Sequence, residues 1–365
     1  MAITYTPTVR HDDVYFDCYT WLSEIRKRGG IPITGIFRTA QILNRHFRPA
    51  YVWDGEDLSK KFGDYEVLRL GAYLGQAIHV LRPHTMQKEA RGFISLGVEQ
   101  TPPRLSEKVK YRIAILHDCM AARSVFGSLS RTRFSAGIGQ NNVLLYVSES
   151  TRLDYDRLLK QDRSLIALRQ QKLLPFPQCH HLTELPLEDD QLKTVSSLSV
   201  HSLFPYKNME RLAEVIKAFP ARHTHIGQNH LTCLQTEEWN RLRKKHKITW
   251  NQNCSDADLV KAYRDTPYFF CLSRSEGFSL PPMEAILNGA SFVVLSAIPA
   301  HLEVYGQYSV NFVSPEVGDY IPDNLKAITD NDRFRLFQQR TPAKMMAELL
   351  NLPLRPRRSS NALND

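Results

Sequence analysis

The chain has 365 residues, more than one typical hydrophobic core requires, and its length suits two domains of ordinary size. Hydrophobic residues make up 42% and charged residues 23%, a globular balance that excludes collagen-like and intrinsically disordered classes. The formal net charge of +9 favours anionic partners, namely sugar nucleotides, anionic lipid surfaces or nucleic acid.

The cysteines and the first residues indicate the compartment. Six cysteines are scattered along the chain without a C-x-x-C pair, which is typical of buried free thiols in a reducing environment. The start, "MAITYTPTVRHDD", lacks the profile of a signal peptide, and no window approaches the roughly 18 apolar residues of a spanning helix. We therefore expect a cytoplasmic protein, with peripheral contact to the inner face of an anionic membrane left open.

The N-terminal half alternates apolar runs with helical patterns. A β-branched and aromatic run at 13–22 predicts a buried strand that ends near Asp17. Apolar runs at 112–119 and 142–150 end in polar residues and predict interior strands of a parallel sheet. The expected helices follow Thr34, which can cap the first one, and Ser150 or Thr151, either of which can cap the second.

Periodicity fails between about Leu173 and Thr194, and we take 179–194 as a linker. Beyond it, a strand at 195–203, a helix at 208–219 and a strand at 223–227 make one βαβ unit. A second unit contains a helix that starts near Pro282 and stops at the C-terminal Gly289. The sequence thus predicts two doubly wound α/β domains, at 1–178 and 195–335, and a C-terminal helix with a basic tail at 336–365.

The stretch "SRSEGFSLPPMEA" carries two glutamates, Glu276 and Glu284, on either side of a glycine and two prolines. It joins the carboxyl end of a strand to a helix N-terminus, a place where unpaired N–H groups and the helix dipole attract phosphate. The carboxylates would accept hydrogen bonds from hydroxyl groups, and a nucleotide sugar has hydroxyls at both ends. The alternative is a helix start stabilised by acids, worth up to about 1 kcal/mol each.

The longer string "SRSEGFSLPPMEAILNGASFVVLSAIPAHLEV" resembles the donor-binding signature of retaining GT-B glycosyltransferases of the family 4 type, including its E-x7-E pattern. "SLFPYKNMERLAEVIKAF" resembles the family's L-x-P-x-K-N turn and helix. In the first half, "TGIFRT", "ILHDC" and "YVSESTRLD" resemble its glycine loop, "HD" strand end and "VSE-S" segment. The resemblance covers roughly Val14 to Pro315, and it is dense in the second half and patchy in the first.

The resemblance implies a role for each matching position. Glu284 matches the glutamate that binds ribose, Lys207 matches the lysine that holds the donor diphosphate, and His117 matches a histidine near the reacting sugar carbon. The other reading of His117 is a strand-end residue satisfied by a backbone carbonyl. The implied catalytic residues are His117, Glu276 and Lys207. The implied donor-binding residues are Gly35, Arg38, Ser202, Lys207, Arg274, Glu276, Gly277, Phe278, Ser279, Leu280 and Glu284.

Two positions depart from the family pattern. Ser202 stands nearest to the place where many relatives have an arginine, which leaves one positive charge fewer on the leaving diphosphate. Arg38 or Arg274 would compensate, although a loop arginine that is simply solvated accounts for Arg274 equally well. The usual glycine before "V-S-D" is replaced within "NQNCSD", so the resemblance says less about recognition of the base.

The implied fold is GT-B, with two Rossmann-like domains facing each other across a cleft that holds donor and acceptor. The implied activity is retaining transfer of a hexose or pentose from a UDP- or GDP-linked sugar to a hydroxyl, without a metal or other cofactor. We expect the acceptor to be a cell-surface glycan or a lipid-linked saccharide, as in polysaccharide biosynthesis. Two alternatives stay open: glycosylation of a modified nucleic-acid base, and a catalytically weak protein that binds sugar nucleotides.

Overall fold

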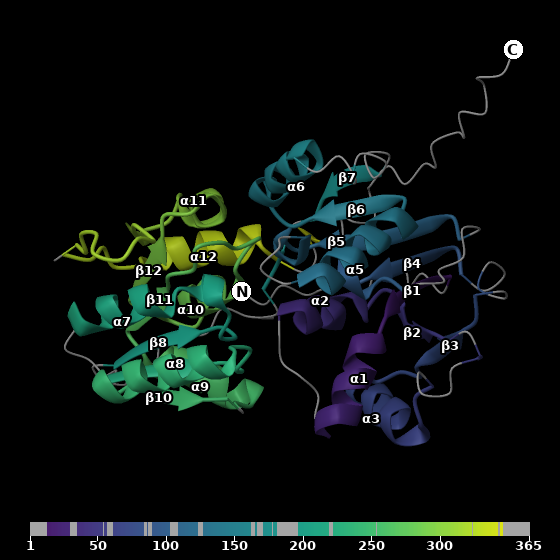
Figure 1. Cartoon of the computed structure of the whole chain (residues 1–365), viewed down its shortest axis with the longest axis horizontal. Coiled ribbons are helices and arrows are strands. Elements are labelled where there is room, and N and C mark those ends of the chain that lie inside the picture. The colour runs from purple at the N-terminus through teal and green to yellow at the C-terminus, as the bar shows by residue number, and fades with distance from the viewer. Residues whose placement is uncertain are drawn as a thin grey trace, which may run out of the picture. The chain divides into compact units, whose positions relative to one another are not determined.

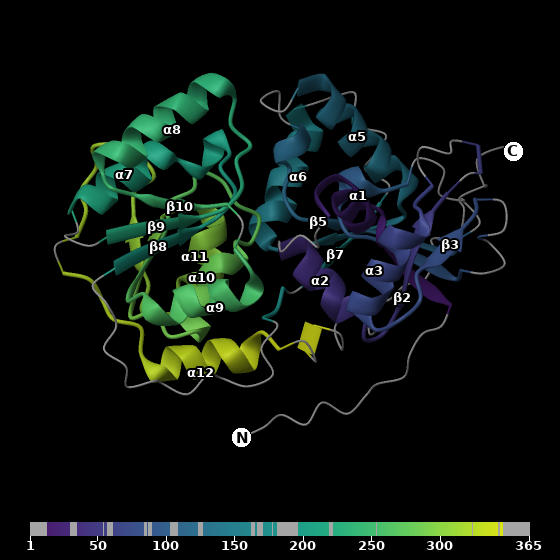
Figure 2. The ribbon, with the colours of Figure 1, turned by 90° about the horizontal axis from the view of Figure 1, so that it is seen from below.

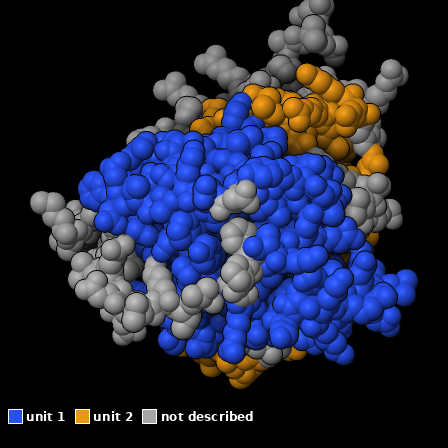
Figure 3. Space-filling model, turned by 90° about the vertical axis from the view of Figure 1, so that its left-hand side faces the viewer, with its two compact units in different colours: residues 1–4, 148–150, 178–344 blue, residues 5–147, 151–177, 345–365 orange. Residues whose placement is uncertain are grey.

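The computed structural model shows two compact units, which are coloured separately in Figure 3. The N-terminal unit comprises described residues within 5–147 and 151–177 together with Met345, and the C-terminal unit those within 148–150 and 178–344. The structure describes residues 13–29, 35–53, 55–56, 61–83, 86, 90–102, 109–122, 127–161, 165, 171–176, 178–180, 196–218, 222–252, 254–322, 324–341 and 344–345. The predicted cap at Thr34, most of the predicted linker at 179–194 and the basic tail lie outside the described residues.

The N-terminal unit contains a parallel sheet of seven strands in the order β3-β2-β1-β4-β5-β6-β7 (Figure 1). Its strands are β1 Val14–Asp17, β2 Arg48–Val52, β3 His79–Leu81, β4 Gly92–Ser95, β5 Tyr111–Leu116, β6 Val143–Tyr146 and β7 Lys172–Pro175. The predicted strands at 112–119 and 142–150 are β5 and β6. The last strand, β7, begins inside the stretch where the sequence periodicity fails.

Within the described part of this unit, five α-helices and two short 3-10 turns accompany the sheet. They are α1 Tyr19–Arg28, α2 Gly35–Leu43, α3 Asp64–Leu74, η2 Val98–Gln100, η3 Met120–Ala122, α5 Gly127–Gln140 and α6 Glu149–Gln161. The predicted strand in the run at 13–22 is β1, and it ends at Asp17 as predicted. The residues that follow form α1, which buries Trp21 and Leu22. The cap prediction for the later helix is wrong, since α6 starts at Glu149, before both Ser150 and Thr151.

The C-terminal unit contains a parallel sheet of six strands in the order β10-β9-β8-β11-β12-β13. The strands are β8 Ser196–Val200, β9 Arg222–Ile226, β10 Thr249–Asn251, β11 Tyr268–Cys271, β12 Phe292–Ser296 and β13 Asn311–Val313. The other elements are η6 Pro205–Lys207, α7 Met209–Ala218, α8 Cys233–Lys245, α9 Asp256–Asp265, α10 Leu280–Leu287, α11 Pro299–Tyr305 and α12 Asp330–Gln339. Both predicted βαβ units are present.

Helices cover both faces of this second sheet. Figure 2 shows α7 and α8 on one face, and α9, α10, α11 and α12 on the other. Helix α7 packs Met209, Leu212 and Ile216 against the sheet, where they join Phe270 and Val294 in one core cluster. Burial on both faces explains why β11 and β12 are continuous apolar runs rather than alternating ones.

In each sheet the chain leaves in opposite directions from a central pair of strands, β1 and β4 in the first and β8 and β11 in the second. Such a switch point leaves a crevice at the carboxyl ends of the strands, where open α/β sheets bind ligands. Among the described residues, no helix combines the length and apolar character that crossing a membrane requires.

Candidate functional site

The loop between β11 and α10 carries the stretch that the sequence singled out. Helix α10 starts at Leu280, two residues before the predicted Pro282, and it ends before Gly289, whose φ of 99° makes it the predicted C-terminal glycine. Ser279 precedes the helix with a φ of 66°, in the left-handed region. This conformation turns the chain sharply, and the carbonyl of Ser279 accepts a hydrogen bond from the Tyr305 hydroxyl. The helix N-terminus is therefore held at the carboxyl edge of the sheet.

Lys207 and Glu276 form an ion pair at this edge. Lys207 ends η6, which follows β8, while Glu276 follows β11, and the two strands are paired neighbours in the sheet. The side chains of both residues are only 12% and 11% exposed, so the pair is largely shielded from water. Ser273 adds a hydrogen bond from its hydroxyl to Glu276 Oε1 at 2.6 Å. Two residues that lie 69 positions apart in sequence are thus brought together by strand order.

The ion pair keeps both groups charged despite their burial. Burial would lower the pKa of Lys207, but the adjacent Glu276 carboxylate outweighs it and raises that pKa above its usual value. Burial would likewise raise the pKa of Glu276, yet the charge of Lys207, together with His301 and the hydrogen bonds from Lys207 and Ser273, lowers that pKa. A fixed ammonium at a sheet edge beside a helix N-terminus is suited to a phosphate group.

Glu284 lies in the first turn and a half of α10 and is 6% exposed. The hydroxyl of Tyr263, from α9, donates a hydrogen bond to Glu284 Oε2 at 2.9 Å. Burying a carboxylate costs folding free energy, and an exposed acid would stabilise the helix N-terminus equally well. The burial therefore argues against the reading of Glu284 as an exposed helix-stabilising acid.

Three metal-ligating side chains also meet in this region. One ligand atom each of Cys271, Glu276 and His301 lies within 4.8 Å of the others. The ring of His301 is oriented through Nδ1, which lies 2.9 Å from the Ser296 carbonyl oxygen. Thiol, carboxylate and imidazole are suitable zinc ligands. However, Glu276 already pairs with Lys207, whose positive charge repels a metal cation, so the cluster fits a polar lining better than a metal centre.

The other residues predicted in the C-terminal unit surround this loop. Gly277 and Phe278 are buried, and the Phe278 ring packs 5.3 Å from the guanidinium of Arg340. Leu280 is the first residue of α10. Arg274 is exposed, and its backbone N–H donates to the Tyr206 carbonyl at 2.8 Å, which ties the β11 loop to the Lys207 turn. Ser202 is partly exposed and follows β8 in the same segment.

The residues predicted in the N-terminal unit belong to a separate group. Gly35 is the first residue of α2 and Arg38 lies in its first turn, with side chains that are not described. His117 follows β5, and its Nε2 lies 2.7 Å from the Leu96 carbonyl oxygen. Burial lowers the pKa of His117, against the raising effect of that hydrogen bond. This is the contact expected of a strand-end histidine satisfied by the backbone, and the catalytic role stays a prediction.

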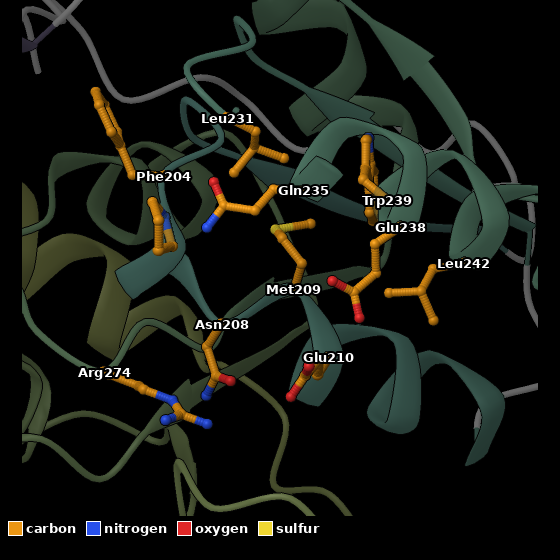
Figure 4. Close-up of a pocket in the computed structure, with 11 residues that line it drawn as sticks. Phe204, Asn208, Met209, Glu210, Leu231, Gln235, Glu238, Trp239, Leu242 and Arg274 are labelled. Atoms are coloured by element: carbon orange, nitrogen blue, oxygen red, sulfur yellow. The ribbon is translucent and has the colours of Figure 1, made fainter. Parts of the chain in front are cut away.

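A pocket of about 260 Å³ lies beside the Lys207 turn, between α7 and α8. Figure 4 shows Met209 and Gln235 pointing into it. Its lining consists of Phe204, Pro205, Asn208, Met209, Glu210, Leu231, Gln235, Glu238, Trp239, Leu242 and Arg274. Of the predicted site residues only Arg274 contributes, so this pocket is distinct from the Lys207–Glu276 pair.

The sequence analysis missed four polar residues of the site: Tyr263, Ser273, Cys271 and His301. Ser273 is the first residue of the stretch "SRSEGFSLPPMEA". Its position three residues before Glu276 could have suggested a contact between the two. Tyr263 lies on α9 and His301 on α11, and no spacing relates them to Glu284 or Glu276. Only the packing of α9, α10 and α11 around β11 brings them together.

The sequence comparison agrees with this location of the site. Residues 189–332 match the family described as "Glycosyl transferases group 1". This region spans less than half of the chain and contains the Lys207 turn, β11, the loop and α10. No curated protein sequence matches the chain.

Solved structures match almost the whole chain at low identity. Anabaena Alr3699/HepE in complex with UDP and glucose is 12% identical, with a TM-score of 0.66 over 93% of this chain and 99% of that one. The N-terminal domain of Candida albicans trehalose-6-phosphate phosphatase is 9% identical, with a TM-score of 0.58 over 96% and 95%. An E. coli trehalose-6-phosphate protein bound with UDP-2-fluoro glucose is 12% identical, with a TM-score of 0.52 over 93% and 92%. The chain has the GT-B fold. At such identities the likeness establishes the fold alone, with its two Rossmann-like units.

Proposed function

We propose that the protein is a glycosyltransferase whose C-terminal unit binds a nucleoside diphosphate sugar. The observation that carries this proposal is the buried Lys207–Glu276 pair next to Glu284, at the switch point of the second sheet and inside the region that matches group 1 glycosyltransferases. Lys207 and the N-terminus of α10 would bind the diphosphate, Glu284 the ribose and Glu276 the sugar. Similar folds that bind UDP and UDP-2-fluoro glucose support a UDP-linked donor, with a GDP-linked one as the alternative.

We propose further that transfer retains the anomeric configuration and requires no metal. The leaving diphosphate gains negative charge as its bond to the sugar breaks, and a preorganised ammonium stabilises that charge. Lys207 supplies it, held in place by Glu276 and Ser273. The acceptor would be a hydroxyl of a surface glycan or lipid-linked saccharide, handled by a cytoplasmic enzyme of polysaccharide biosynthesis.

A panel of radiolabelled UDP- and GDP-sugars tests the proposal. The wild-type protein should bind at least one of them and release its sugar slowly to water in the absence of an acceptor, with or without a metal chelator. Lys207→Ala should reduce this release, whereas Lys261→Ala should not, because Lys261 is 72% exposed on α9 and pairs with the exposed Asp265. Failure to bind any nucleotide sugar contradicts the proposal. Binding without release or transfer would instead indicate a sugar-nucleotide-binding protein.

A further inference from the structure

The switch point of the N-terminal sheet lies between β1 and β4, and each of these strands ends in a polar residue. Asp17 is the last residue of β1 and Ser95 the last residue of β4. The strands are parallel, with Phe16 opposite Ile94, so Asp17 and Ser95 are the next pair in register. Paired residues of adjacent strands share a face and lie about 5 Å apart. Both side chains therefore stand together at the carboxyl edge.

Both side chains are buried, and each has an atom without a hydrogen-bond partner among the described residues. Asp17 is 1% exposed and Ser95 is fully buried. Asp17 Oδ2 and Ser95 Oγ lack a partner, and they do not bond to each other. An unsatisfied buried polar atom costs about 1–3 kcal/mol. Two such atoms lie side by side at the sheet edge where open α/β folds bind ligands. A bound ligand that hydrogen-bonds to both atoms would remove this cost.

A structural role accounts for only part of Asp17. Its Oδ1 accepts a hydrogen bond from the Tyr19 N–H at 3.1 Å, which satisfies an N–H group of the first turn of α1. Asparagine would serve that purpose equally well. No described residue donates a hydrogen bond to the remaining oxygen, Oδ2. Burial raises the pKa of the carboxyl to about 7, against the lowering effect of the Tyr19 and Cys18 amides.

His117 places a second functional candidate beside this pair. Its Nε2 contacts the carbonyl of Leu96, the residue that directly follows Ser95. The ends of β1, β4 and β5 thus bring a carboxyl, a hydroxyl and an imidazole to neighbouring positions of one sheet edge. This set is suited to hydroxyl-bearing ligands and poorly suited to phosphate, because Asp17 carries the wrong charge.

We propose that Asp17 and Ser95 bind the hydroxyl group of the acceptor, with Asp17 Oδ2 accepting its hydrogen bond and Ser95 Oγ donating one to its oxygen. The assignment of this ligand as the acceptor rests on the proposed glycosyltransferase function. Binding of a polyol at Asp17 and Ser95 does not depend on that function. The ligand class is a saccharide or another polyol, and water can take the place of its hydroxyl group when no such ligand is bound. Asp17 is then a substrate-binding residue of the N-terminal unit, which the sequence resemblance did not assign.

Asp17→Asn tests the proposal with little risk to the fold, because the amide oxygen still accepts from the Tyr19 N–H. We expect transfer of labelled sugar to water and to glycerol to fall at least tenfold in Asp17→Asn and at least threefold in Ser95→Ala. The affinity for UDP should stay unchanged, since the C-terminal unit would bind it. Asp13→Asn is the matched control, since it changes an aspartate beside the amino end of β1, partnered by Arg91 at 3.9 Å.

The pH profile separates binding from a structural role. Wild-type transfer should rise as pH increases through about 7, when Asp17 ionises, and this step should vanish in Asp17→Asn. A crystal soaked in glycerol at neutral pH should show a hydroxyl between Asp17 Oδ2 and Ser95 Oγ. Unchanged transfer and an unchanged pH profile in Asp17→Asn would overturn the inference, as would a crystal in which the chain itself covers both atoms. If the wild-type protein does not bind UDP, the proposed function is overturned instead.

Discussion

The two units share one architecture, but their sheet strands bury different titratable groups. The C-terminal sheet buries His223 and His225 on β9, with exposures of 1% and 0%, whereas the N-terminal sheet buries Asp17 at the end of β1. Ser199 of β8 lies 2.9 Å from His223 Nε2 and 2.8 Å from His225 Nδ1. The same fold therefore tolerates a buried base in one sheet and a buried acid in the other, and burial favours the neutral form of each.

The difference predicts opposite responses to acid. Burial lowers the pKa of His225 to about 3 and lowers that of His223 as well, so the unfolded chain takes up protons below about 6.5 and the folded one does not. Burial raises the pKa of Asp17 to about 7, so the folded chain takes up its proton first. Acid thus removes stability contributed by the β9 histidines and adds stability through Asp17 at the end of β1.

The sharpest way to separate the two units is a matched pair of glycine substitutions. A Cβ at Gly137 would lie 1.8 Å from the Val98 carbonyl oxygen, and a Cβ at Gly227 would lie 1.8 Å from that of His201. Because backbone must move in both cases, Gly137→Ala should destabilise the N-terminal unit and Gly227→Ala the C-terminal unit, each by about 3 kcal/mol. Hydrogen exchange measured by peptide reports each unit separately. Gly97→Ala, whose Cβ would meet only ordinary contacts, is the control.

Lys207→Ala should have the largest effect on activity. Removing a charge that stabilises the leaving group costs on the order of a hundredfold in turnover. Steady-state kinetics with the sugar nucleotide that the wild type uses measures this loss. The stability of the N-terminal unit should not change. Lys207→Arg should retain part of the turnover that Lys207→Ala loses. Turnover within threefold of wild type in Lys207→Ala would refute the phosphate role.

Acidification from pH 7.5 to 5.5 should affect the units in opposite directions. The contribution of His225 alone should fall by about 1.4 kcal/mol, since its unfolded form becomes protonated below its ordinary pKa. The contribution of Asp17 should rise by about 2 kcal/mol, because protonation removes the cost of a buried charge. Hydrogen exchange in β9 and β1 peptides checks both signs. In Asp17→Asn the gain in β1 should disappear, and parallel weakening of both units would break the comparison.

Tyr263→Phe should have the smallest effect. The loss of its 2.9 Å hydrogen bond to Glu284 releases the carboxylate from one defined position, a change worth about 1 kcal/mol. We expect nucleotide-sugar affinity to weaken about fivefold in calorimetric titration, with hydrogen exchange in the N-terminal unit unaltered. If the affinity for the nucleotide sugar is unchanged in both Tyr263→Phe and Glu284→Gln, Glu284 does not contribute to donor binding.

Local patterns predicted the elements whose neighbours in sequence are also their neighbours in space. The spacing of Glu276 and Glu284 defined one loop and one helix start, and the structure has both within two residues of the prediction. Helix α1 was not predicted, because the aromatic and apolar residues Tyr19, Trp21 and Leu22 suit a buried strand as well as a helix. The start of α6 was missed because Glu149, Ser150 and Thr151 all suit a first helical turn.

The sequence by itself determined that the chain would form two parallel α/β units, and it placed Glu276 in the loop after a strand and Glu284 at the start of the following helix. These features follow from hydrophobic periodicity and from loops, which are local along the chain. The tertiary structure alone decided that Lys207 meets Glu276, that Tyr263 holds Glu284 and that Asp17 stands beside Ser95. Each pairing depends on which strands or helices become neighbours, and that choice is made by burying the apolar faces of whole elements, which no short stretch of sequence encodes.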